Sequence, residues 1–145
     1  MSIREAHNKD AVEITKMYRK LYGEEFSEEK IIPIDHSKII SKIFLSHENE
    51  TSEMITGFIW ITIIEHGESR YGQIEELFVK PGYRKKEYGG LLVEKAKKFF
   101  TEKSIQAAFV SVDSIHDTGL INFYTKQDFH ICKGPWYYFT PHSLD

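Results

Sequence analysis

The spacing of hydrophobic residues changes from segment to segment along the chain, and each spacing predicts a type of element. Residues 11–21 carry apolar side chains three and four positions apart, which predicts a helix capped by Asn8 or Asp10 and ending near Gly23. Residues 54–64 form a nearly continuous run of β-branched and aromatic residues, which is typical of a strand that is buried on both faces.

The second half of the chain alternates between strand-like and helix-like patterns. A turn separates the first long apolar run from a second one, so residues 54–79 predict an antiparallel hairpin. Apolar residues recur at helical spacing over residues 92–100, with lysines and a glutamate between them. The remaining predicted elements are a short strand at residues 2–6, a helix or a strand from residue 37, a buried strand at residues 105–112, a helix at residues 117–126 and a closing hairpin at residues 129–140.

This order of elements predicts an α/β domain with a mixed sheet. No internal repeat, low-complexity tract or linker-like stretch divides the 145 residues. A chain of this length can bury roughly 70% of the surface that it exposes when unfolded. We therefore expect a single domain over residues 1–145.

Composition and charge exclude several classes of function. No apolar run approaches the roughly 20 residues of a membrane helix, so we expect no membrane contact. The first ten residues lack an apolar signal segment, and the single cysteine, Cys132, suits a reducing compartment, so we expect a cytoplasmic protein. A net charge of −3 favours no nucleic-acid partner. The seven histidines lack metal-ligand spacing, so we expect no metal.

Positive charge gathers in one loop, between the strand that ends at Val79 and the helix that follows. This loop contains Arg84-Lys85-Lys86 and then Gly89-Gly90. The first turn of a helix presents unpaired N–H groups, and glycines let a phosphate approach the backbone closely. The stretch predicts a cradle for a small anionic cofactor, and the alternative is a solvated basic turn.

The run EELFVKPGYRKKEYGGLL resembles the acetyl-CoA loop of the GCN5-related N-acetyltransferase (GNAT) superfamily, in which a strand leads into Q/R-x-x-G-x-G/A at a helix N-terminus. Arg84 takes the first position of that motif and Gly89 takes the last. Glu87 replaces the middle glycine, and Lys85 stands where many members also have glycine. A carboxylate beside a pyrophosphate raises the Coulomb energy, and a residue with a Cβ adopts positive φ less readily than glycine. Both departures predict weaker cofactor binding.

The resemblance covers nearly the whole chain and implies a fold, a cofactor and a cofactor site. The implied fold is a single acyl-CoA N-acyltransferase domain, with a mixed, mostly antiparallel sheet of about six to seven strands and about four helices. The implied co-substrate is acetyl-CoA, with its pantetheine arm where the strands EELFV and AAFVSV separate and its pyrophosphate on the loop N–H groups. The residues implied to bind it are Leu77, Phe78, Val79, Arg84, Lys85, Lys86, Glu87, Tyr88, Gly89, Gly90, Asp117 and Phe123.

Two adjacent glutamates are the candidates for a catalytic base. Amine acetylation requires a proton to leave an ammonium group whose pKa is ~10, and a carboxylate is a usual acceptor. As neighbours in a strand, Glu75 and Glu76 are expected to face opposite sides of the sheet. Resemblance to polyamine acetyltransferases implies Glu75 as the base and Glu76 as a ligand for the substrate cation. Other members have the base at the position of Gln73, which cannot serve, and a pair of solvated glutamates is the alternative.

The helix predicted at residues 117–126 carries the candidate acid. The superfamily places a tyrosine of its last helix near the coenzyme A sulfur, and the resemblance assigns that role to Tyr124. A phenol with an ordinary pKa of ~10 is protonated at neutral pH and can give its proton to a leaving thiolate. Asp117 stands where the family pattern has asparagine. A core tyrosine with a solvated hydroxyl is the alternative.

Together these residues predict an acetyl-CoA-dependent N-acetyltransferase in which an amine attacks the thioester directly in a ternary complex. We expect a small primary amine as the acceptor, such as a polyamine, a diamine or a basic amino-acid analogue. The motifs EELFV and INFY support this acceptor, as do Glu24 and Glu25, which follow the first helix where the superfamily builds its acceptor site. Aminoglycosides, protein amino groups and a non-catalytic binding domain remain alternatives. A homodimer is a further expectation, because family members often dimerise.

Overall fold

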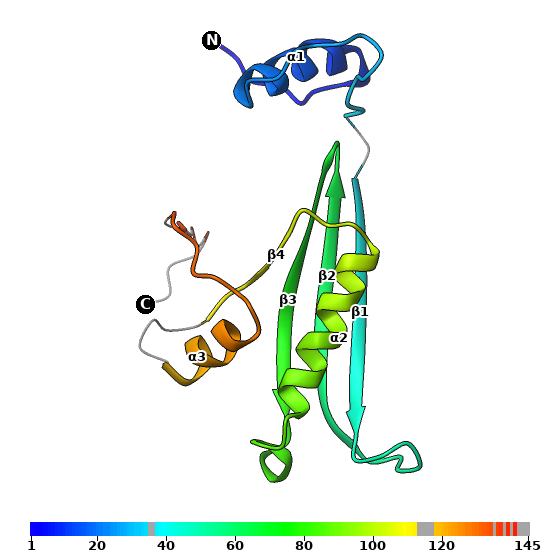
Figure 1. Cartoon of the computed structure of the whole chain (residues 1–145). Coiled ribbons are helices and arrows are strands. Elements are labelled where there is room, and N and C mark those ends of the chain that lie inside the picture. Colours follow the sequence, from blue (N-terminus) through cyan, green and yellow to red (C-terminus); the bar gives the residue numbers. More distant parts are fainter. Residues whose placement is uncertain (35–36, 113–117, 135, 138, 140, 142–145) are drawn as a thin grey trace. The chain divides into compact units, whose positions relative to one another are not determined.

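The computed structural model describes residues 1–34, 37–112, 118–134, 136–137, 139 and 141. The chain forms two compact units, Met1–Ser111 and Val112–Asp145. The described residues form four strands and three α-helices, which are labelled in Figure 1. In chain order the elements are the 3-10 helix η1 (Asn8–Asp10), α1 (Ala11–Leu21), β1 (Ser37–His47), β2 (Ile55–His66), β3 (Ser69–Val79), the 3-10 helix η2 (Pro81–Tyr83), α2 (Tyr88–Glu102), β4 (Ala107–Val110) and α3 (Thr118–Lys126).

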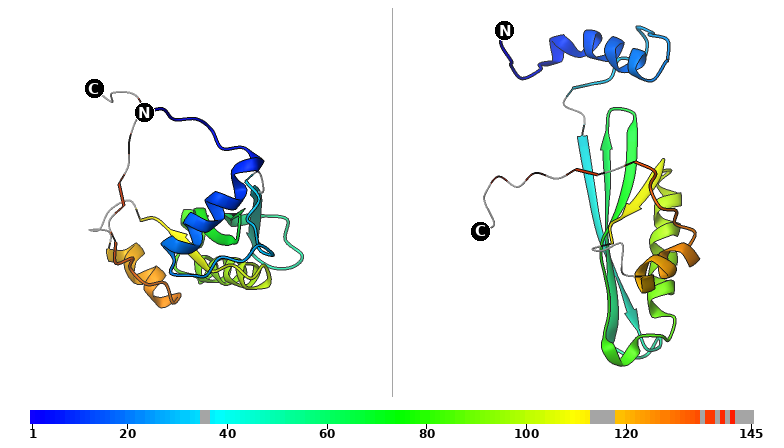
Figure 2. Two further views of the ribbon diagram at one scale, coloured as in Figure 1. Left: turned by 90° about the horizontal axis from the view of Figure 1, so that it is seen from above. Right: turned by 90° about the vertical axis from the view of Figure 1, so that its left-hand side faces the viewer.

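The strands of the first unit form one mixed sheet in the order β1-β2-β3-β4. The pairs β1–β2 and β2–β3 are antiparallel, which confirms the predicted hairpin, and β4 lies parallel to β3. The pattern from residue 37, which fitted either a helix or a strand, forms β1. Helix α2 lies lengthwise over one face of β1, β2 and β3 (Figures 1 and 2). This is the α/β arrangement that the order of elements predicts.

The core of the first unit lies between β2 and α2. Its most buried hydrophobic side chains come from alternate positions of the strand and from one side of the helix, and include Ile59, Ile61, Ile63, Val93 and Ala96. At Gly72 of β3 an added Cβ would lie 2.5 Å from the ring of Phe100, so the bare backbone makes room for this ring. Since side chains alternate along a strand, the residues between these core positions face the other side of the sheet.

Helix α1 is held to the turn between β2 and β3 by a buried arginine. Arg19 forms an ion pair with Glu68 in that turn and a second one with Glu24, at 2.9 Å. The hydrogen bonds from Arg19 hold the pKa of Glu68 below its usual range. The buried side of α1 includes Arg19, whereas Met17 and Leu21, which are part of the predicted apolar side, are exposed. The sequence therefore predicted α1 itself, but its contact with the rest of the first unit includes the ion pair of Arg19 with Glu68, where an apolar side was expected.

The second unit contains α3, and Tyr124 is its buried residue. The side chain of Tyr124 is 8% exposed. Its ring packs edge-to-face on Phe123, at 5.0 Å between centroids, and on Phe129, at 5.6 Å. The N–H of Phe129 donates to the carbonyl of Tyr124 at 3.0 Å as the chain leaves the helix. The helix predicted over residues 117–126 is confirmed at Thr118–Lys126.

The number of elements differs from the one that the resemblance implies. The described residues form four strands and three α-helices, against the expected six to seven strands and four helices. Residues 2–6 form no strand, and neither do the described residues of the predicted hairpin at 129–140. A strand is stable only with a partner edge, and Ile131, Trp136 and Tyr137 are 80%, 77% and 90% exposed. The aromatic and β-branched pattern provides strand propensity, but the described residues of these segments join no strand of the sheet.

Candidate active site

Strand β3 carries one extra residue where it pairs with β2. Trp60 of β2 lies opposite Glu76, but the next residue of β2, Ile61, lies opposite Ile74, so Glu75 has no position of its own in the ladder. This is a β-bulge, in which two residues of one strand oppose one residue of the other. Bulges redirect side chains and are common beside active sites. The candidate base is therefore the bulged residue.

The bulge changes the direction in which the two glutamates face. The expectation that Glu75 and Glu76 lie on opposite faces does not hold, because regular alternation is interrupted between them. Both oppose Trp60, whose side chain lies on the face away from α2, since its neighbours Ile59 and Ile61 are buried in the core. Both glutamates are exposed. Two carboxylates therefore share one face of the sheet, directly across from an indole ring.

One edge of β3 pairs with β2, and the opposite edge is not paired with β4 beyond the bulge. The parallel ladder of the two strands ends at the pair Ile74–Val110. No β4 residue pairs with the stretch Leu77–Val79. The resemblance implies that these two strands separate at their carboxyl ends, and this register agrees with it. Backbone N–H and C=O groups at this edge can bind a ligand that lies along the strand.

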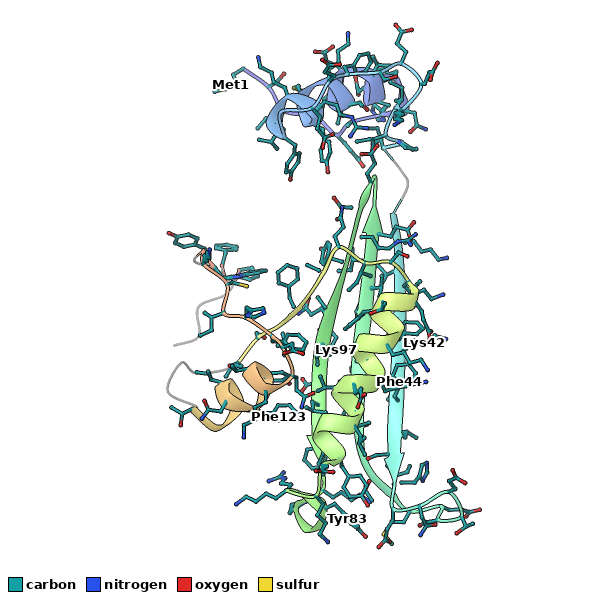
Figure 3. All side chains as sticks on the ribbon, in the orientation of Figure 1. Met1, Lys42, Phe44, Tyr83, Lys97 and Phe123 are labelled. Carbon is teal, nitrogen blue, oxygen red and sulfur yellow. The ribbon has the colours of Figure 1, made fainter. Side chains whose placement is uncertain are left out.

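The loop after β3 is held by its own backbone and by aromatic rings. The Nε of Arg84 donates to the carbonyl of Val79 at 2.9 Å, and its guanidinium lies 5.6 Å from the centroid of the Phe78 ring. The ammonium of Lys86 lies 5.6 Å from the centroid of the Tyr83 ring. Figure 3 labels Tyr83 at the end of the sheet where α2 begins. Two of the loop cations are therefore positioned by neighbours in the loop and the strand end.

The start of α2 offers hydrogen-bond donors to an anion. Glu87 is the N-cap of the helix and makes no side-chain capping bond. Its carbonyl accepts from the N–H of Leu91 at 3.0 Å. The N–H groups of Tyr88, Gly89 and Gly90, in the first turn, have no acceptor within the helix, and the helix dipole adds a partial positive charge there. This arrangement fits a pyrophosphate, and the unpaired edge of β3 fits a pantetheine arm.

Two residues of the loop adopt a left-handed backbone without being glycine. Lys85 has φ 62° and Glu87 has φ 70°. Glycine adopts this region at almost no steric cost, whereas other residues are strained there. The loop therefore has a left-handed backbone at the position of the middle motif glycine, with the side chain of Glu87 attached to it.

The predicted acid lies in the second unit of the chain. Tyr124 lies on α3, and Phe123, an expected cofactor-binding residue, packs against it. Asp117, the other residue expected from this segment, lies outside the described residues. The roles of these three residues remain predictions.

The acidic segment after α1 divides into two kinds of carboxylate. Glu24 forms its ion pair with Arg19 and so helps to anchor the end of α1. Glu25 is exposed and makes no ion pair in the described part of the chain. Of the two residues of this segment that were predicted to bind the acceptor, Glu25 is the one whose carboxylate forms no ion pair in the described part of the chain.

Trp60 lies opposite the candidate glutamates, and the sequence pattern did not single it out. It is 41% exposed, and its Nε1 donates to the Oγ of Ser41 at 2.7 Å, which fixes the position of the ring. In the sequence it lies within a run that looks uniformly buried. Only the register of β2 against β3 brings it opposite the two glutamates, so no local signal could have identified it.

The sequence predicts neither a metal site nor a membrane span. Across the residues that the structure describes, no group of three or more histidine, cysteine, aspartate and glutamate side chains is arranged to hold a metal ion. No helix within the described ranges has the length and apolar character needed to cross a membrane.

Within the described residues, the β3 edge that β4 leaves unpaired beyond Ile74 leads through a basic loop into the first turn of α2, which is an α/β arrangement suited to a ligand that carries both an extended chain and a phosphate group. Comparison with known families matches residues 9–129 to the acetyltransferase (GNAT) family. The chain belongs to this family, and the predicted class of enzyme, an acetyl-CoA-dependent N-acetyltransferase, is confirmed. A search of curated proteins finds no match.

Several solved structures share the fold at low sequence identity. An aminoglycoside acetyltransferase from an uncultured soil metagenomic sample is 22% identical, with a TM-score of 0.52, over 62% of this chain and 60% of its own length. A protein from Agrobacterium tumefaciens C58, named as an acetyltransferase, is 17% identical, with a TM-score of 0.61, over 97% of this chain and 100% of its own. A second soil metagenomic aminoglycoside acetyltransferase, in complex with sisomicin, is 15% identical, with a TM-score of 0.58, over 92% of this chain and 88% of its own.

Proposed function

We propose that the chain moves the acetyl group of acetyl-CoA to a small primary amine by direct attack in a ternary complex. We also propose that its two units work together as one N-acetyltransferase domain. The observation that supports this function most strongly is the bulge at Glu75. An exposed carboxylate lies at the point where pairing between β3 and β4 ends. The candidate base and the edge that fits the pantetheine arm are thus adjacent on one strand.

Glu75 takes the proton that the acceptor must lose. A primary amine is an ammonium ion at neutral pH, with a pKa of ~10, and its nitrogen cannot attack until a proton leaves. An exposed carboxylate can accept that proton directly or through one water molecule. Acetyl-CoA, when bound, supplies an activated thioester, so a C–N bond forms as the C–S bond breaks.

Tyr124 and the backbone of β3 act on the leaving group and on the carbonyl. N–H groups of the strand near Phe78 donate to the carbonyl oxygen, which carries negative charge as the nitrogen attacks. The phenol of Tyr124 gives its proton to the departing sulfur, and the second proton that the nitrogen loses as the amide forms passes to solvent, which reprotonates the phenol. The role of Tyr124 rests on the family resemblance and that of Glu75 on the resemblance together with the bulge.

The acceptor that this face favours is cationic. Glu75 and Glu76 attract an ammonium group, and the exposed ring of Trp60 can hold a second cationic centre by a cation–π contact. Glu25, in the segment after α1, remains a further carboxylate that the family resemblance predicts to bind the acceptor. Polyamines, diamines and basic amino-acid analogues carry the separated positive charges that such a surface binds.

Aminoglycosides are the second candidate acceptors. They carry several ammonium groups, and two of the structures that share the fold are named as aminoglycoside acetyltransferases, one of them in complex with sisomicin. A protein amino group is a further alternative. A cytoplasmic location and a homodimer complete the proposal, and both rest on composition and family resemblance.

The test is the release of free thiol from acetyl-CoA in the presence of single amines. The panel contains spermidine, cadaverine, lysine amide and sisomicin, with glutamate as an anionic amine that this face disfavours. We expect turnover with at least one polycationic amine and none with glutamate. Failure to bind acetyl-CoA, together with no turnover of any amine, would support the non-catalytic alternative, which the departures from the family pattern at Lys85, Glu87 and Asp117 favour.

Matched substitutions test the assigned roles. Glu75→Gln and Tyr124→Phe are each expected to lower kcat at least tenfold while leaving the fold intact. Glu76→Gln changes the neighbouring carboxylate on the same face, and we expect it mainly to raise KM for a cationic amine. If an amine is acetylated and neither Glu75→Gln nor Tyr124→Phe slows the reaction, the assigned roles are wrong.

A further inference from the structure

The loop before α2 contains a side chain whose charge opposes the ligand that the loop fits. Glu87 caps the helix with φ 70°, and its carboxylate makes neither a capping bond nor an ion pair in the described part of the chain. Glu87 is exposed. A non-glycine residue at this φ carries some steric strain.

The cations next to Glu87 in sequence form no ion pair with its carboxylate in the described part of the chain. Arg84 is directed to the carbonyl of Val79 and the ring of Phe78, and Lys86 lies over Tyr83. Lys85, which also has positive φ, makes no ion pair within the described ranges. The first turn of α2 therefore follows an N-cap residue whose exposed carboxylate makes no ion pair within the described ranges.

A carboxylate at this place has opposite effects with and without a ligand. Without one, a negative charge at a helix N-terminus stabilises the helix through its dipole. With a pyrophosphate on the same N–H groups, the carboxylate repels it. A glycine at this position would leave the backbone conformation unstrained and remove the repulsion.

We propose that Glu87 is an affinity-lowering residue, which weakens the binding of coenzyme A through its charge and so speeds release of the product. This inference rests on the proposed function, because it assigns the first turn of α2 to the pyrophosphate. The backbone of the loop supports binding, and the side chain of Glu87 limits it. Glu87 thereby sets the balance between holding the co-substrate and releasing the product.

Calorimetric titration of the full chain with coenzyme A tests this, with four variants. Glu87→Gln removes the charge and keeps the Cβ, and we expect its Kd to fall roughly three- to tenfold at low salt. The Kd of Glu87→Gly for coenzyme A is expected to fall at least as far as that of Glu87→Gln. The gain in affinity of the Glu87 variants over the wild type should shrink as ionic strength rises, because salt screens the charge of Glu87. In the same preparations without ligand, Glu87→Gln should unfold at a slightly lower temperature than the wild type, so affinity and stability move in opposite directions.

Two matched controls separate charge from backbone strain. Lys85→Gly also replaces a left-handed residue by glycine, but it removes a positive charge, so we expect its Kd to rise. Glu94→Gln removes an exposed carboxylate of the same helix about 10 Å from Glu87 along the axis, and its Kd should stay within twofold of the wild type.

Three outcomes overturn the inference. A Kd of Glu87→Gln within twofold of the wild type shows that the charge has no effect on binding. A gain that is unchanged at high salt shows that the effect is not electrostatic. If neither the wild type nor any variant binds coenzyme A, the proposed function fails together with the inference, whereas equal binding by all of them overturns the inference alone.

Discussion

The two faces of the β2–β3 pair come from the same strands and have opposite properties. On one face Ile59, Ile61 and Ile63 lie buried in the core with α2. On the other face Trp60 is partly exposed, and Glu75 and Glu76 stand opposite it. The first face binds the helix and stabilises the fold. The second contributes little to the core, which leaves its residues available for chemistry.

The bulge is the feature that makes the second face different. Regular alternation along β3 would have left only one carboxylate on it. One inserted residue adds a second carboxylate without disturbing the core position Ile74, which stays 3% exposed. Stability and chemistry can therefore be altered independently, and the following substitutions test that separation.

The largest effect is expected from Ile61→Ala, on the helix-facing side. Removing a fully buried branched side chain should lower the free energy of unfolding by about 2–5 kcal/mol. The matched change on the other face, Trp60→Ala, removes a side chain that is 41% exposed, and we expect a smaller loss. Urea unfolding of both variants measures the two values, and equal losses would contradict the division of the strand into two faces.

A smaller effect is expected from Gly72→Ala. The added Cβ would lie 2.5 Å from the Phe100 ring, so the ring or the strand has to move. Overpacking of this kind should reduce stability by about 1–3 kcal/mol. Gly82→Ala is the matched control, because nothing lies within 4 Å of a Cβ at that position. Thermal unfolding measures the midpoint of each variant. Equal falls in the two midpoints would contradict the close contact between Gly72 and the Phe100 ring.

A pH-dependent effect is expected at the turn between β2 and β3. Arg19 lowers the pKa of Glu68 by hydrogen bonding to its carboxylate. A carboxyl whose pKa is lowered by folding stabilises the fold above its unfolded pKa of about 4.3, and loses that contribution as pH falls through the folded value. The wild type should therefore unfold at a higher temperature than Glu68→Gln near neutral pH, and the gap should close below about pH 4.

The control for this measurement is Glu25→Gln, which removes an exposed carboxylate that makes no ion pair in the described part of the chain. Its midpoint should follow that of the wild type at every pH. A gap between the wild type and Glu68→Gln that is constant with pH would show that the ion pair does not link α1 to the turn in the way described.

The smallest effect on stability is expected from Glu75→Gln. The residue is exposed and has no ladder position of its own, so the free energy of unfolding should change by less than about 0.5 kcal/mol. The same variant is expected to lose at least tenfold in turnover. Chemical unfolding and turnover are measured on one preparation of the variant. If the free energy of unfolding and the turnover fall together, Glu75 has a structural role.

The sequence predicted the elements whose periodicity depends on local residues. The β2–β3 hairpin, α2 and α3 all follow from spacing, because the buried side of each is set by positions two, three or four apart. The loop after β3 was also predicted, since its basic residues and glycines are contiguous in the chain. These features are the ones that a one-dimensional pattern records.

The features that the sequence did not reveal depend on partners far away in the chain. The bulge at Glu75 appears only when β3 is aligned with β2. The anchor of α1 is Arg19, whose partner Glu68 lies 49 positions further along the chain. The predicted strand at residues 2–6 and the hairpin at 129–140 had suitable composition, but their pattern contains no information about which edge they would pair with.

The measurement that tests the central claim most directly is the thermal unfolding midpoint of the full chain across a titration with acetyl-CoA. A ligand at 100 times its Kd adds about 2.7 kcal/mol of stability, which raises the midpoint of a domain of this size by several degrees. We predict a saturable rise, with no rise in a parallel titration with acetate at equal ionic strength. An unchanged midpoint at millimolar acetyl-CoA would contradict the assignment of the β3 edge and the α2 N-terminus to the co-substrate.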